Sequence, residues 1–344
     1  MFIVFIITYN NIILVTSKVF TRGRIIVQQS STPNRTFLTS IILTTVFMGS
    51  SFPTGKYLIS FEHVPPFFLG GYRFIIAGLI MILWTLITGG WKAIIPTSRE
   101  SFGRGFALVA AIGLLQTAGT MGLLNLAMAA GLSSSMSSIV LFTNPLWLAI
   151  LAHFLLKDKL TGWKVFSLIL GISGVITCLG LDRSAFGVGA LFALFGSFCW
   201  SVNTIVTKKV PFDKGPWIFT GWQMLIGGVF MLIFSGLLHE SYDIKHLGTW
   251  GWICVVWLIL PASVGSFGCW FSSLRQRGAT IASSFLFLVP LFSTVFSILG
   301  LHDKFTVELV IGGLLVVTAL ILVNKSASIP SEKATYSDNI EAIK

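Results

Sequence analysis

The chain has 344 residues, of which 54% are hydrophobic and only 10% are charged, and its formal net charge at pH 7 is +11. A soluble globular domain carries about 25% charged residues, so this composition excludes an ordinary water-exposed surface. A bilayer fits it better, because an apolar core about 30 Å thick is crossed by a helix of about 20 apolar residues.

The first 36 residues are predicted to form a cytoplasmic segment ahead of the membrane domain. Within it, residues 2–16 are apolar, but Asn10 and Asn11 interrupt them and the stretch is short for a membrane span. We interpret it as a signal-like or interfacial segment. If it crossed the bilayer instead, the N-terminus would lie outside.

Ten long apolar stretches follow. They lie at residues 38–58, 66–88, 105–127, 133–156, 162–180, 187–207, 216–238, 248–273, 279–300 and 306–323. Backbone polar groups cannot stay unpaired in hydrocarbon, so only helices or a closed barrel can cross it. Barrel strands would be about 10 residues long with alternating polarity, whereas these stretches are longer and continuously apolar. The sequence therefore predicts an all-α integral membrane protein with ten transmembrane helices.

The distribution of positive charge predicts the orientation of these helices. Most of the 23 Lys and Arg residues fall in every second connection and in the two terminal segments. Because cytoplasmic loops attract Lys and Arg, we expect a multi-pass protein of the cell membrane with both termini in the cytoplasm. The basic residues then mark topology and contact lipid head groups, and they do not form a nucleic-acid surface. The polar tail, residues 324–344, is predicted to be disordered.

The second half of the chain repeats the first. Residues 137–147 read SSIVLFTNPLW, and residues 282–292 read ASSFLFLVPLF. The segments GGYRFIIAG (70–78) and TGWQMLIGG (220–228) match in the same way. The matched Ser and Pro residues carry more weight than the matched apolar residues, because apolar helices resemble one another by chance.

These matches divide the chain into two copies of a five-helix unit, at residues 37–180 and 187–323. Because five is odd, the second copy enters the membrane from the opposite side. The sequence thus predicts two inverted five-helix repeats, a plan used by secondary transporters with a binding site near the midplane. A membrane enzyme or a structural subunit has no comparable need for this symmetry.

The chain resembles the EamA family of the drug/metabolite transporter superfamily over about residues 37–323. The motifs that carry the resemblance are FMGSSFPTGKYL, YRFIIAGLIM and AMAAGLSSSMSSIVLFTNPLWLAILAHFLLKDKL in the first copy, and CWSVNTIVTKKV, WQMLIGGVF and RQRGATIASSFLFLVPLFSTVFSILGLHDKF in the second. The resemblance implies ten helices in two inverted repeats, with a small-metabolite site between helices 3, 4, 8 and 9 and beside helices 1 and 6. The glutamate usual in the family after the fourth helix is replaced here by Asp158 and Asp303.

Arg73 is the basic residue that lies well inside a predicted helix. A charge at the centre of a membrane helix costs about 2.5–3.5 kcal/mol on insertion scales, so Arg73 needs a partner or water. It is a candidate anchor for a substrate carboxylate, or a structural residue that bonds backbone carbonyls. Gln223 occupies the matching position of the second copy and is a candidate of the same kind.

Other polar residues at membrane depth are candidate substrate ligands. They are Gln116, Asn125, Ser138, Asn144, Asn203 and Ser283. Each needs a hydrogen-bonding partner in hydrocarbon, so contacts between helices are the competing interpretation. Asn144 precedes Pro145, whose missing N–H is expected to kink the helix and free carbonyls toward a cavity. Trp200 and Trp270 are candidates for an apolar wall beside the substrate.

The combination of inverted repeats and polar residues predicts a carrier that exports amino acids or similar metabolites by alternating access. A proton-coupled multidrug exporter and a membrane protein without transport activity, either an enzyme or a structural subunit, are the alternatives. No nucleotide-binding glycine loop, catalytic triad or metal motif is visible, so we expect no cofactor and no enzymatic activity. The expected partners are a small-molecule substrate and the lipid bilayer, with the protein as a monomer or a homodimer.

Overall fold

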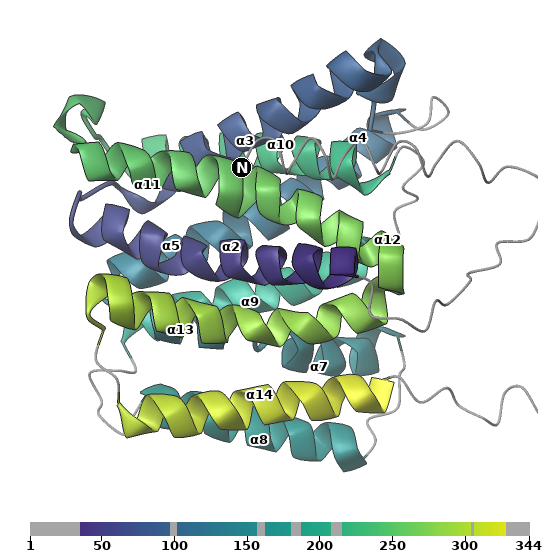
Figure 1. Ribbon diagram of the computed structural model, residues 1–344, viewed down its shortest axis with the longest axis vertical. Coiled ribbons are helices and arrows are strands. Elements are labelled where there is room, and N and C mark those ends of the chain that lie inside the picture. Colours follow the sequence, from purple (N-terminus) through teal and green to yellow (C-terminus); the bar gives the residue numbers. More distant parts are fainter. Residues whose placement is uncertain are drawn as a thin grey trace, which may run out of the picture.

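The computed structural model describes residues 35–96, 102–156, 162–179, 187–207, 215–303 and 306–327, and this part of the chain is all-helical (Figure 1). The predicted all-α fold is therefore confirmed. Most of the predicted N-terminal segment, most of the tail and Asp158 lie outside the described residues.

The first half contains five helical spans and a short connecting turn. They are α2 (Arg35–Ser60), α3 (Pro66–Gly89), the 3-10 turn η1 (Trp91–Ala93), a third span of α4 (Phe102–Ile112), η3 (Gly113–Gly122) and α5 (Leu123–Ala129), a fourth span of α6 (Ser134–Leu141) and α7 (Asn144–Leu156), and α8 (Gly162–Leu179). The segment η3 is a π-helix, a rare form that is frequent at functional sites.

The second half follows the same plan. It contains α9 (Val188–Thr207), α10 (Pro216–Leu237), the turn η4 (Ile244–His246), a span of α11 (Thr249–Ile259), the π-helix η5 (Leu260–Gly265) and α12 (Ser266–Ser284), then η6 (Phe285–Phe287), α13 (Leu288–Leu301) and α14 (Val307–Ala327). A kink at Gly278, where φ is 78°, separates the last residues of α12 from the rest of that helix.

Eight helices within the described residues are long and apolar enough to cross a bilayer. Two shorter apolar helices, Gly162–Cys178 and Val307–Ala319, fall on the predicted fifth and tenth spans. The membrane character of the fold is thus confirmed, whereas ten crossings and their inversion stay predictions.

Equivalent helices of the two halves pack in pairs. Figure 1 shows α3 along α10 near the top and α8 along α14 at the bottom. Glycines allow these backbones to approach closely. A Cβ atom added at Gly78 of α3 would lie 2.6 Å from the carbonyl oxygen of Gly221, and one added at Gly174 of α8 would lie 2.8 Å from that of Gly312. Small residues serve this purpose in membrane helix packing.

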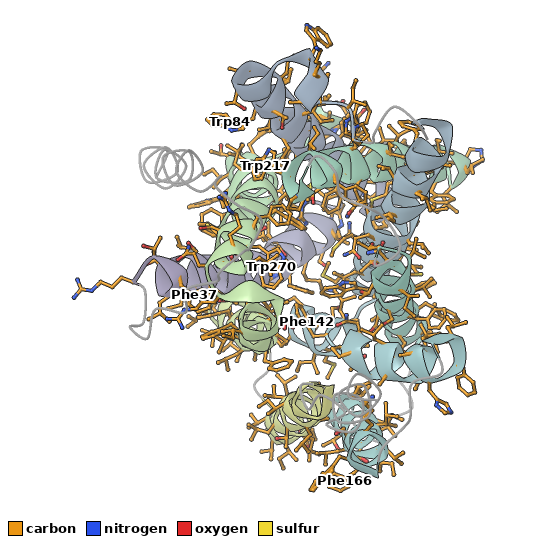
Figure 2. All side chains as sticks on the ribbon, turned by 90° about the vertical axis from the view of Figure 1, so that its right-hand side faces the viewer. Phe37, Trp84, Phe142, Phe166, Trp217 and Trp270 are labelled. Atoms are coloured by element: carbon orange, nitrogen blue, oxygen red, sulfur yellow. The ribbon has the colours of Figure 1, made fainter. Side chains whose placement is uncertain are left out.

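The first helices of the two halves lie between these outer pairs. Helix α2 packs against α12 and α13 of the second half, and α9 packs against η3, α5, α6 and α7 of the first half. Figure 2 looks along the helices. In this view Trp84 of α3 and Phe166 of α8 lie on opposite sides of the bundle, with Phe142 between them. The two halves therefore meet around α2 and α9.

Candidate functional site

Helix α9 presents a polar face to the interrupted fourth span of the first half. Helix α6 ends at Leu141, and α7 begins at Asn144, directly before Pro145. The hydroxyl of Ser201 on α9 donates a hydrogen bond to the backbone oxygen of Asn144 at 2.7 Å. One turn earlier, the hydroxyls of Ser197 and Thr143 lie 3.2 Å apart. The break before Pro145 is thus held by hydroxyl groups from the other half.

An amide pair of the buried Asn203 and the half-buried Gln116 connects the same face of α9 to η3. Asn203 Nδ2 donates a hydrogen bond to Gln116 Oε1 at 2.8 Å, and the Thr207 hydroxyl donates to Asn203 Oδ1 at 3.3 Å. Asn203 is 7% exposed. In a low-dielectric interior an unpaired amide is costly, so each member of the pair depends on the other.

Aromatic rings lie beside these polar groups. The rings of Trp200 and Phe142 meet edge to face with centroids 5.3 Å apart, and Phe142 lies 6.4 Å from Phe52 of α2. Asn144, two residues after Phe142, is half-buried. Its side-chain amide has no hydrogen-bond partner among the described residues. This amide is therefore available to a ligand at the point where α2, α9 and the broken fourth span meet.

A second polar cluster surrounds η5. Arg73 Nε donates a hydrogen bond to the Ser263 hydroxyl at 3.0 Å, and its guanidinium carbon lies 4.7 Å from the centroid of the Phe74 ring. Nearby, Trp257 Nε1 donates to the Ser50 hydroxyl at 2.9 Å. Arg73 forms no ion pair within the described part of the chain. Its charge is thus bonded to one neutral hydroxyl and could bind an anionic group.

The other predicted residues lie apart from these two clusters. Asn125 Nδ2 donates to the backbone oxygen of Pro66 at 3.0 Å, and the Ser138 hydroxyl donates within its own helix. Gln223 is buried, and its backbone oxygen accepts a hydrogen bond from Thr117 at 3.4 Å. Ser283 lies half-buried in the last turn of α12, after the kink.

Trp270 and Trp200 belong to different clusters. Trp270 packs with Phe37, Ile41 and Ala282. Trp200 packs with Phe52 and Phe142. The two tryptophans therefore do not form one wall in this structure.

Several residues of the site carry no signal in the sequence. Ser50, Ser263 and Trp257 are ordinary membrane-helix residues, and only their distances identify them as partners. Ser50 lies in the segment FMGSSFPTGK, which carries the family resemblance, but nothing in that segment singles out this serine from Ser51.

Taken together, the two clusters contain neutral hydroxyls, amides and aromatic rings, and the cluster around η5 adds one arginine. The described residues contain no group of His, Cys, Asp or Glu that could hold a metal ion. Such a set of groups can bind a small polar organic molecule through hydrogen bonds and one charge contact.

These observations define a multi-pass membrane protein built from two related helical halves. A family model described as the EamA-like transporter family matches residues 36–180 and 187–325. The chain belongs to the EamA-like transporter family, and the resemblance found in its motifs is confirmed.

Relatives of known sequence cover most of the chain. A chloroplastic WAT1-related protein of Arabidopsis thaliana is 27% identical over 297 residues, which are 81% of this chain and 69% of that protein. The uncharacterised transporter YoaV of Bacillus subtilis is 25% identical over 284 residues, or 80% and 92% of the two chains. One crystal structure matches with a TM-score of 0.59 and 19% identity, covering 86% of this chain and 99% of that one, which supports the fold.

Proposed function

We propose that this protein is a carrier that exports small organic metabolites, above all amino acids, across the cell membrane by alternating access. Membership in a transporter family supports transport of a small molecule as its class of function. The relatives named as transporters also favour a carrier over an enzyme. Substrate class, direction and mechanism are argued below from the residues.

Reciprocal packing supports two halves of opposite orientation. Helix α2 contacts the third and fourth spans of the second half, and α9 contacts the third and fourth spans of the first half. Any two-fold axis relates helices in this way; because each half has an odd number of predicted spans, the axis would lie in the membrane plane, which allows one central site to face either side in turn. We propose ten crossings on this basis, with both termini in the cytoplasm.

The observation that carries the proposal is a polar site at half the depth of the bilayer. Asn144 lies about ten residues after the start of α6, which is about 15 Å at 1.5 Å per residue and half of the apolar thickness. Its free amide, the Ser201 hydroxyl and the Gln116–Asn203 pair offer neutral hydrogen-bonding groups there. Arg73 adds a positive charge on the other side of the passage. A neutral or zwitterionic molecule with a carboxylate fits these groups.

The positions of the acidic residues bear on how transport is driven. None of the 12 Asp and Glu residues falls in the middle of a predicted span. Proton-driven carriers commonly use a carboxylate at that depth. Facilitated diffusion or exchange is therefore the mechanism we propose, rather than proton-coupled drug export.

Purified protein in liposomes tests the proposal. Efflux of a panel of radiolabelled amino acids is measured with and without a pH gradient, for the parent and for Asn144→Ala combined with Ser283→Ala. We expect gradient-independent transport in the parent and about a tenfold loss of kcat/KM in the variant, the value of one good hydrogen bond to a charged group. Thr318→Ala, on the exposed surface of α14, is the matched control.

Three outcomes would contradict parts of the proposal. An unchanged rate and affinity in the double variant would remove Asn144 and Ser283 from the pathway. Strong dependence on the pH gradient would favour a proton-coupled exporter. Absence of transport for a broad metabolite panel would favour a membrane protein without transport activity.

A further inference from the structure

Three turns at one end of the bundle share an unusual pairing of residues. In each turn a histidine with a left-handed backbone stands next to an acidic residue. The pairs are His63 beside Glu62, His239 beside Glu240, and His302 beside Asp303. These histidines, with φ of 54–55°, are the non-glycine residues of positive φ in the described chain. In all three pairs the histidine is exposed and the acid is half-buried.

Each turn follows the end of a span. A left-handed residue after a helix reverses the chain and satisfies the last carbonyls, but it is strained for any residue other than glycine. The turns after α2, α10 and α13 lie together at the left of Figure 1. The three acids are thereby held in fixed places over the ends of other helices.

Glu240 binds the start of α3. This helix begins after Pro65 with Pro66, and no nearby side chain caps it. The Glu240 carboxylate accepts hydrogen bonds from the backbone N–H groups of Phe67 and Phe68, at 3.4 and 2.9 Å. It therefore satisfies two donors that the helix start leaves unpaired, in a position where the helix dipole favours negative charge.

Glu62 binds the start of α11 in the same way. Its carboxylate accepts a hydrogen bond from the N–H of Gly248 at 3.2 Å and another from the Tyr57 hydroxyl at 3.3 Å. A Cβ atom added at Gly251, in the first turn of α11, would lie 3.0 Å from the carboxyl carbon of Glu62. The glycines at this helix start thus leave room for the acid.

Asp303 binds the start of α6. The hydroxyl of Ser134, the first residue of that helix, donates a hydrogen bond to Asp303 Oδ2 at 3.3 Å and also lies in hydrogen-bonding contact with the Ser297 hydroxyl. The charge of Asp303 also acts on Lys56, whose Nζ donates to the backbone oxygen of Met128 at 2.7 Å.

All three contacts cross between the halves. Glu240 and Asp303 belong to the second half and bind helices of the first, and Glu62 belongs to the first half and binds a helix of the second. Two adjoining hollows at this end, of about 410 and 490 Å³, share Gly131 and are lined by Lys56 and by Asp303, respectively. At the opposite end, the described contacts between the halves include the bond from Trp222 Nε1 to the Ile94 oxygen at 2.7 Å and the Arg277 guanidinium, whose carbon lies 5.8 Å from the centroid of the Phe37 ring.

We propose that Glu62, Glu240 and Asp303 are gating residues that hold this end of the carrier closed. The inference rests on the proposed alternating access, in which the halves must separate at one end and then at the other. Separation here breaks three charge-assisted contacts at once, so their strength sets how often this end opens. The histidine turns keep each acid in place while the gate is closed.

Site-directed labelling tests the gate without any substrate. A reporter, Asn144→Cys, is placed in the full-length chain after replacement of Cys178, Cys199, Cys254 and Cys269 by alanine. The protein is reconstituted in liposomes, and a membrane-impermeant maleimide is added on the side of the three acids. The labelling rate is compared for Glu62→Gln, Glu240→Gln, Asp303→Asn and the triple variant. Glu308→Gln, an exposed acid at the same end, is the matched control.

We expect labelling to rise about two- to fivefold in single variants, and about tenfold or more in the triple variant, as contacts at helix starts are weakened. Glu240→Asp, which keeps the charge, should lie closer to the parent. Equal labelling of the parent and a triple variant that keeps the parent's thermal unfolding midpoint would overturn the proposal, as would an equal rise in Glu308→Gln. Failure of amino-acid transport would not change this readout, so the two proposals fail separately.

Discussion

The two π-helical segments, one in each half, share a backbone feature but differ in the residues that contact them. Segments η3 and η5 interrupt the third span of each half. In both, a hydroxyl bonds a carbonyl five residues earlier, from Thr120 to Leu115 at 3.0 Å and from Ser263 to Leu258 at 2.8 Å. The backbone feature is therefore shared. A feature of this kind often marks a functional site in a helix.

The partners of the two segments differ. An amide pair connects η3 to α9, whereas the Arg73 guanidinium of α3 donates to the Ser263 hydroxyl of η5. Directly after η5, the backbone oxygen of Ser266 accepts a hydrogen bond from the Thr44 hydroxyl of α2 at 3.5 Å. Segment η3 is also packed more tightly. A Cβ atom added at Gly113 would lie 2.9 Å from the Gln223 oxygen on α10, but one at Gly265 would meet its nearest atom only at 3.2 Å. A shared backbone feature thus gives the proposed passage one neutral wall, around η3, and one charged wall, around η5.

The largest expected effect breaks the packing of η3. In Gly227→Ala the new Cβ atom would lie 2.3 Å from Thr117 Cβ and 2.5 Å from the Gly113 oxygen, so backbone must move. We expect a loss of about 3 kcal/mol in the free energy of unfolding, at the upper end for overpacking. Gly265→Ala in η5 should cost about 1 kcal/mol or less. Thermal unfolding in detergent measures both, and equal losses would show that the two segments are packed alike.

The next effect concerns the amide pair of η3. Asn203→Leu leaves the Gln116 amide without its partner in an apolar surrounding. We expect a destabilisation of about 2 kcal/mol from the amide left unpaired and the lost contact between η3 and α9, together with slower transport. Thr204→Ala, one residue along the same helix, removes only a bond to its own helix and is the control. A variant as stable as the control would mean that the pair does not hold η3 to α9.

The charged wall is tested by its effect on substrate affinity. Arg73→Gln removes the positive charge beside η5 but keeps a group that can donate to Ser263. We expect KM to rise about tenfold for amino acids with a free carboxylate, which corresponds to about 1.4 kcal/mol. The corresponding amino-acid amides should be transported with unchanged KM. Uptake assays with acid and amide pairs check this, and an equal change for both would assign Arg73 to structure alone.

The sequence predicted the helical membrane fold and the two halves because both depend on long patterns. The continuous apolar stretches, the repeat of a unit with an odd number of spans, and Pro145 can all be read from the sequence without knowing which residues are in contact. It also identified Gln116 and Asn203 as polar residues at depth, but it could not pair them, because pairing depends on how far α9 is rotated toward η3. The π-helices had no signal, since one extra residue in a turn does not change an apolar pattern.

The smallest expected effects are the losses of unfolding free energy when two tryptophans, one on each wall, are replaced by phenylalanine. Trp257 Nε1 donates a hydrogen bond to the Ser50 hydroxyl at 2.9 Å, while Trp200 meets Phe142 through ring contact. Because Ser50 also bonds the Phe47 oxygen at 3.0 Å, Trp257→Phe leaves no unpaired serine and should cost about 1 kcal/mol. Trp200→Phe keeps an edge-to-face aromatic pair and should cost less than about 0.5 kcal/mol relative to the parent, below the energy of losing such a pair. Thermal unfolding of both variants in detergent measures the two losses. A larger loss for Trp200→Phe would mean that the neutral wall, rather than the charged wall, is held by an indole N–H.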